Sequence, residues 1–198
     1  MGTHNQEHTD GAVVQLSPDL PAPVFYCTES WHQERIGAAV LYCSDGRWGE
    51  AFDEFCHRHL QIPRYDRLAA AGGPAWLGKQ VVSGEGLMVR GNEKTEPVDH
   101  SPLTTHHSPA LDWERAARSQ LDFLVRVHEL ERLVLITHYG CAYYAERLKR
   151  GPKECLPSQM DDVRLGAERL RRWYPGLSVE GYVAMRTGGC LSFHRLEV

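Results

Sequence analysis

Two short, continuous apolar runs constrain the fold of this chain more than any other feature. Residues 38–42 (AAVLY) and 133–137 (LVLIT) are almost free of polar side chains. The first run ends at a Ser-Asp-Gly segment over residues 44–46, a composition that favours a turn. A run of this length bounded by turn residues is typical of a strand buried on both faces, because a strand with one wet face would alternate apolar and polar residues.

Segments with helical periodicity separate these strands. Apolar residues recur every three to four positions over residues 50–59, 112–130 and 161–173. Ser158 is the expected N-cap of the last of these helices. Residues 68–71 predict another short strand, and 179–185 with 191–196 predict a C-terminal hairpin. Buried strands that alternate with helices predict an α/β fold with a mainly parallel central sheet flanked by helices.

The composition excludes several classes of protein. Lys and Arg number 22 against 26 Asp and Glu among 198 residues, and no basic block occurs. We therefore expect no nucleic-acid partner and no membrane partner. The sequence offers no apolar stretch typical of a signal peptide or a spanning helix, which predicts a cytoplasmic protein. In that compartment the six cysteines stay reduced, and selected ones serve metal binding or catalysis.

The predicted organisation has one main domain and an arm. Residues 1–29 are expected to form an N-terminal arm that is flexible or docks on a partner subunit. Residues 30–198 form the predicted domain. Within it, residues 79–110 are rich in Gly, Pro and mixed polar residues and predict a long excursion between two regular elements.

Chemically reactive side chains follow both buried strands directly. Cys43, Asp45 and Arg47 come after the first strand, and His138 and Cys141 come after the second. Ligands of open α/β sheets collect at the carboxyl ends of the strands. We therefore expect these five side chains to share one site.

Three of these side chains match the ligand set of a zinc site. Zinc prefers thiolate and imidazole ligands, and a site with three protein ligands keeps a fourth position for water or substrate. Taken singly, Cys43 fits a small core residue and His138 fits a satisfied polar residue at a strand end. Their joint placement with Cys141 favours Zn²⁺ as the cofactor.

The same residues resemble a known family. Cys43-x-Asp45-x-Arg47 after one strand, with His138-x-x-Cys141 after a later one, is similar to the zinc signature of the β-class carbonic anhydrases. The resemblance extends over residues 30–198 and includes the Ala-Ala-Gly-Gly stretch at 70–73 and the C-terminal hairpin.

This resemblance implies a zinc lyase that reversibly hydrates carbon dioxide to bicarbonate through zinc-bound hydroxide. It implies that Cys43, His138 and Cys141 hold the metal, and that Arg47 holds Asp45 through a bidentate pair that leaves the fourth metal position open. It also implies a homodimer or a higher assembly of dimers.

The resemblance further implies a substrate pocket at Phe123, Gly72 and Gly73. Phe123 fits a core position on an amphipathic helix equally well.

Two other functions use the same residues. In a closed state Asp45 becomes the fourth zinc ligand, and the protein is a catalytically idle zinc-binding domain. Hydrolases of carbonyl sulfide and carbon disulfide resemble the same family, so a related heterocumulene is an alternative substrate.

Overall fold

The computed structural model describes residues 21, 23–28, 32, 34–78 and 109–198. The chain divides into two units, Met1–Glu34 and Arg35–Val198. In the first unit, Val24, Phe25 and Tyr26 are exposed. A docking role for the N-terminal arm stays a prediction. The expected excursion lies outside the described residues up to position 108.

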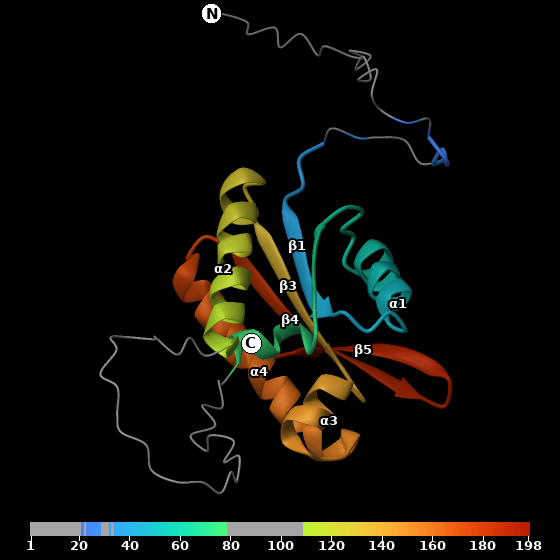
Figure 1. The fold of residues 1–198 in the computed structure, drawn as a ribbon, viewed down its shortest axis with the longest axis vertical. Helices are drawn as coiled ribbons and strands as arrows, with labels where there is room; N and C mark the ends of the chain where they lie inside the picture. Colours follow the sequence, from blue (N-terminus) through green and yellow to red (C-terminus); the bar gives the residue numbers. More distant parts are fainter. Residues whose placement is uncertain (1–20, 22, 29–31, 33, 79–108) are drawn as a thin grey trace, which may run out of the picture. The chain divides into compact units, whose positions relative to one another are not determined.

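Within the described residues, five strands form one sheet in the order β2-β1-β3-β4-β5 (Figure 1). The first four in this order run parallel, and β5 pairs antiparallel with β4. The strands are β1 (Ala38–Cys43), β2 (Asp66–Ala70), β3 (Arg132–His138), β4 (Ser178–Thr187) and β5 (Cys190–Leu196). The predicted α/β class, with a mainly parallel sheet and a C-terminal hairpin, is confirmed. Gly188 and Gly189 close that hairpin with φ of +56° and +85°, the left-handed region that a two-residue turn requires.

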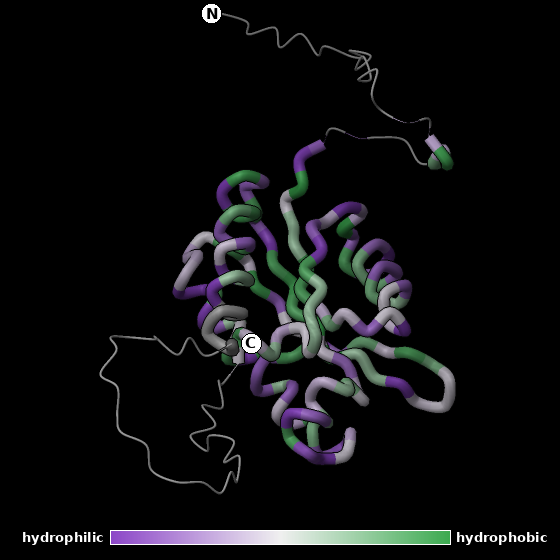
Figure 2. The backbone as a smooth tube through the Cα atoms, viewed as in Figure 1, coloured by the Kyte–Doolittle hydropathy of each residue, from purple (hydrophilic) through white to green (hydrophobic). Residues whose placement is uncertain are grey.

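Helices cover both faces of the sheet. Successive strand residues point to opposite faces, so neighbouring residues of one strand contact different helices. Leu41 packs with α2 (Pro109–Val127), α4 (Pro152–Trp173) and the short 3₁₀ helix η2 (Gly73–Leu77). Val40, its neighbour in the strand, packs instead with α1 (Gly49–Glu54) and the π-helical turn η1 (Phe55–His59). Figure 1 shows α1 on one side of the sheet and α2 on the other, and Figure 2 shows that the strands between them are mostly apolar.

Helix α4 begins at Pro152, so the predicted start near residue 161 with a Ser158 cap is wrong. Gly151 is the N-cap, and Pro152 occupies the first helical position, where a missing N–H leaves no bond unmade. Pro157 lies inside the helix and costs it one backbone hydrogen bond. The earlier start makes residues 152–160 helical, and this places Gln159 on the buried face of α4.

A further helix, α3 (Ala142–Leu148), links β3 to α4. Among the described helices, none combines the length and the apolar character needed to cross a membrane.

Candidate metal centre

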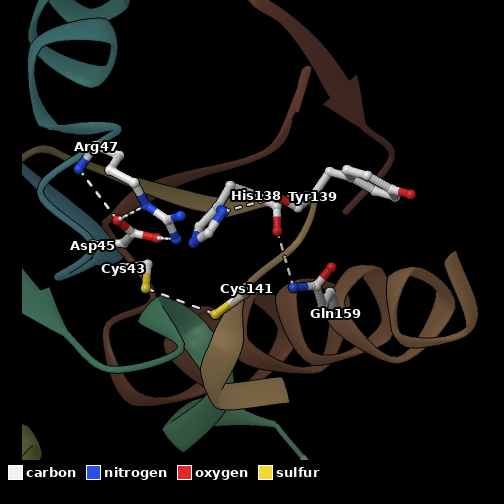
Figure 3. Close-up of polar contacts among 7 residues, drawn as sticks. All are labelled: Cys43, Asp45, Arg47, His138, Tyr139, Cys141 and Gln159. Carbon is white, nitrogen blue, oxygen red and sulfur yellow. Dashed lines mark hydrogen bonds and ion pairs between the residues drawn. The ribbon is translucent and has the colours of Figure 1, made fainter. Parts of the chain in front are cut away.

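Two neighbouring strands and the turn after one of them bring three ligand side chains together. Cys43 is the last residue of β1, His138 is the last residue of β3, and Cys141 is the N-cap of α3. Their ligand atoms all lie within 4.8 Å of one another, and all three residues are buried. The two Sγ atoms are 3.7 Å apart (Figure 3). Among the described residues, this is the group of His, Cys, Asp or Glu side chains that could hold a metal ion.

Glycines allow the backbone to approach the cluster closely. Gly140 has a φ of +76°, which lets the chain turn between His138 and Cys141. Gly73 lies so near the end of β1 that a Cβ on it would be 2.8 Å from the backbone nitrogen of Cys43. Gly72 has a φ of +77°, and the aromatic ring of Tyr143 covers it. The chain therefore needs glycine at 73 in order to place Cys43.

The ring of His138 has one satisfied nitrogen and one without a partner. Nδ1 lies 3.1 Å from the backbone oxygen of Tyr139, so Nδ1–H donates to that carbonyl and Nε2 carries the lone pair. Nε2 is buried and has no hydrogen-bond partner among the described residues. A buried acceptor left unpaired costs about 1–3 kcal/mol, and coordination of a metal would remove that cost. A ligating histidine ordinarily donates its other N–H to a carbonyl in this way. The two sulfurs and this nitrogen therefore fit zinc.

The two thiols share a hydrogen bond that separates their acidities. The Cys141 thiol donates to Cys43, which lowers the pKa of Cys43 and raises the pKa of Cys141. The backbone N–H groups of Asp45 and Gly72 further lower the pKa of Cys43. Cys43 is thus the thiol of the pair that loses its proton more readily, and metal binding requires the deprotonated form.

Asp45 is turned toward Arg47 and away from the sulfurs (Figure 3). Arg47 donates from Nε to Oδ1 at 2.9 Å and from Nη2 to Oδ2 at 2.5 Å. Its backbone N–H also donates to Oδ1 at 3.2 Å. These hydrogen bonds lower the pKa of Asp45 to about 2. Asp45 is therefore an ionised carboxylate whose two oxygens are both bound by the guanidinium.

An aromatic wall covers one side of the cluster. The ring centroid of Trp48 lies 4.9 Å from that of His138, and the ring of Phe52 lies 6.5 Å from it. A cavity of about 240 Å³ opens beside this wall and Arg47. The residues that line it are Arg47, Trp48, Tyr139, Gly140, Pro152, Arg186 and Leu191.

The predicted pocket residues lie in different places. Gly72 and Gly73 stand beside Cys43 at the start of η2. Phe123 lies on α2, is 48% exposed, and contacts the ring of His128. None of the three lines the cavity beside Arg47. A role for these residues in a substrate pocket stays a prediction.

Sequence reasoning missed two residues of the site. Trp48 packs against the ring of His138. It directly follows the Cys-x-Asp-x-Arg segment, and this position could have indicated that its side chain lies beside the site. Gln159 donates from Nε2 to the backbone oxygen of His138 at 3.0 Å. Gln159 was missed because the helix was expected to begin only after this residue.

Comparisons with known proteins give matches among solved structures only. No protein-family model and no curated protein matches the sequence. A tetrameric β-carbonic anhydrase of Sordaria macrospora is 12% identical with a TM-score of 0.44, over 81% of each chain. One of Aspergillus fumigatus is 11% identical with a TM-score of 0.46, over 86% of this chain and 95% of the other. Isoform I of Trichomonas vaginalis is 15% identical with a TM-score of 0.42, over 85% and 87%. These similar structures are all β-carbonic anhydrases.

Proposed function

We propose that this protein is a zinc-dependent carbonic anhydrase that reversibly hydrates carbon dioxide to bicarbonate. One observation carries the proposal: the ligand atoms of His138 and two thiols lie within 4.8 Å of one another, and the buried His138 Nε2 has no hydrogen-bond partner among the described residues. A carboxylate that an arginine holds lies beside them. The sequence motifs at these positions support the same activity. A cytoplasmic location and a homodimer or higher assembly of dimers belong to the proposal as well.

The ligand set determines what the neighbouring residues must do. Cys43, His138 and Cys141 would hold zinc, which when bound supplies Lewis-acid activation of water. Two thiolates would cancel the charge of a bound zinc ion, so such a centre would activate water less strongly than one with three neutral ligands. The surrounding side chains therefore have to contribute to the reaction.

Asp45 is the residue suited to that contribution. With a pKa of about 2 it is ionised at any physiological pH. It therefore accepts hydrogen bonds and does not titrate during turnover. Arg47 binds both of its oxygens and keeps the carboxylate away from the ligand cluster. In this position Asp45 can orient the attacking water toward carbon dioxide, and Arg47 keeps it from becoming a fourth ligand.

The proposal is tested by metal content and hydration kinetics on the full chain. Zinc near one per chain, together with stopped-flow hydration of carbon dioxide that rises between about pH 6.5 and 9, supports it. Zinc without turnover across that range overturns the enzymatic part and leaves an idle zinc domain or a hydrolase of a related heterocumulene. A chain that binds no zinc overturns the ligand assignment.

Two cysteine variants provide a matched comparison. Cys43→Ser removes one sulfur of the cluster and is expected to lose zinc and turnover together. Cys56 is also fully buried, but it belongs to η1 and lies in the core on the α1 side of the sheet, and burial raises its pKa to about 11. Cys56→Ser is expected to keep zinc. Equal zinc content in the two variants would contradict the proposal.

A further inference from the structure

Buried polar side chains gather behind the ligand cluster. In the part of the chain that the structure describes, the buried polar or charged residues are Thr137, His138, Gln159 and Asp162. Two belong to β3 and two to α4, and the α4 pair is separated by three positions, which places both on one face of the helix. Burial of such groups costs free energy unless hydrogen bonds compensate it. Their partners therefore show why α4 carries them.

Gln159 holds the backbone of a ligand residue. It is 0% exposed, and its Nε2 donates to the carbonyl oxygen of His138 at 3.0 Å (Figure 3). The pairing of β1 with β3 ends at Leu41 and Leu135, three positions before His138. On the β4 side, Tyr139 N–H donates to the Ala184 oxygen. A side chain from α4 thus supplies the donor that β1 no longer provides.

Asp162 binds α3, the helix that follows the ligand Cys141. It accepts from the Tyr144 hydroxyl at 2.8 Å and from Arg147 Nη1 at 3.1 Å. Both donors lie on α3, which begins directly after Cys141, and Tyr144 is fully buried. On its other side Asp162 lies against Gly78, where a Cβ would be 1.9 Å from Oδ1. Asp162 is therefore fixed between η2 and α3.

We propose that Gln159 and Asp162 are positioning residues for the metal centre. Gln159 fixes the backbone of His138, and Asp162 fixes the helix that starts at Cys141. Together they set the separation of the imidazole nitrogen and the sulfur before the ion binds. This inference rests on the proposed zinc site and deepens it: residues that orient the ligands of a metal change its affinity about 10–100-fold when they are lost.

The stability and the zinc affinity of a Gln159 variant distinguish the positioning role from a purely structural one. Gln159 Oε1 has no hydrogen-bond partner among the described residues. An apolar side chain of similar size therefore removes this unpaired oxygen, although it also leaves the His138 carbonyl without its donor. Gln159→Met should then leave the metal-free protein folded. A structural role would change the unfolding of the metal-free protein and leave the affinity of its folded form for metal unchanged.

The experiment compares Gln159→Met with Gln120→Met, the same substitution at an exposed position of α2. Zinc affinity is measured by competition with a chelator, and Co²⁺ is added to the metal-free protein to record its ligand-field bands. Gln159→Met is expected to bind zinc about 10–100-fold more weakly and to shift the Co²⁺ bands. Gln120→Met is expected to match the wild type in both measurements.

Tyr144→Phe provides a second variant that removes one hydroxyl from Asp162. It is expected to weaken zinc binding as well, and it keeps the inference testable if Gln159→Met does not fold. Wild-type affinity and unchanged Co²⁺ bands in the folded variants overturn the positioning role while the proposed function stands. A wild-type protein that binds neither zinc nor Co²⁺ overturns both.

Discussion

Replacement of Gly73 by alanine tests whether close backbone contact places the first ligand. Gly73 has a φ of +55°, and an added Cβ would lie 2.8 Å from the Cys43 nitrogen, 2.9 Å from the Tyr42 carbonyl carbon and 3.1 Å from the Ile136 oxygen. All three atoms belong to the backbone of the central strands, so no side chain can rotate away. Either η2 or the end of β1 must move.

Gly188 provides a control with almost the same backbone conformation. Its φ is +56°, but a Cβ there would meet nothing within 4 Å. Gly188→Ala therefore carries the left-handed backbone penalty alone, about 1–2 kcal/mol. Gly73→Ala carries this penalty plus an overpacking cost of about 1–3 kcal/mol, for a total of about 2–5 kcal/mol. The difference between the two variants isolates the steric contact at the metal centre.

Urea unfolding of the metal-free variants measures the stability difference, and chelator competition measures zinc affinity. Gly73→Ala is expected to be less stable than Gly188→Ala and to bind zinc more weakly, because Cys43 is displaced. Gly188→Ala is expected to bind zinc like the wild type. If both variants lose the same stability and keep wild-type zinc affinity, the contact between Gly73 and β1 does not hold Cys43 in place.

Two further predictions concern ion pairs. Arg47→Ala is expected to abolish carbon dioxide hydration with zinc still bound, because it frees the Asp45 carboxylate to turn to the metal; kinetics and metal analysis check this, and an active, zinc-loaded variant would contradict it. Burial raises the pKa of Glu180, but hydrogen bonds from Arg132 at 2.5 Å and from Tyr182 at 2.6 Å outweigh burial and leave the pKa lowered. This stability is present above the unfolded pKa of about 4.3 and disappears as pH falls through the folded pKa. Glu180→Gln should therefore lower the free energy of unfolding by about 1–3 kcal/mol at pH 7, and urea unfolding at low pH should show that difference shrinking.

The sequence predicted the fold best where every residue of a segment is buried. The run 38–42 is buried throughout, so its apolar pattern alone identified β1 and the ligand Cys43 that ends it. His138 was identified in the same way from β3.

The positioning residues could not be found by that reasoning. Gln159 is a polar residue on an apolar helix face, and its partner is a backbone carbonyl, which leaves no trace in the sequence pattern. Ser158, directly before Gln159, was the expected N-cap, so the helix was expected to begin only after Gln159, whereas α4 begins at Pro152. The contact between Asp162 and α3 likewise depends on how two helices pack, which periodicity does not determine.

The separation of the ligands along the chain affects the order of folding. Cys43 and Cys141 are 98 positions apart and meet only when β1 and β3 pair. Closure of so long a loop is a slow, non-local step, so the complete ligand set does not exist early in folding. Zinc that binds after this step should stabilise the finished structure and slow its unfolding, with little effect on the folding rate. A bound ion would then extend the lifetime of the native state without helping the chain to reach it.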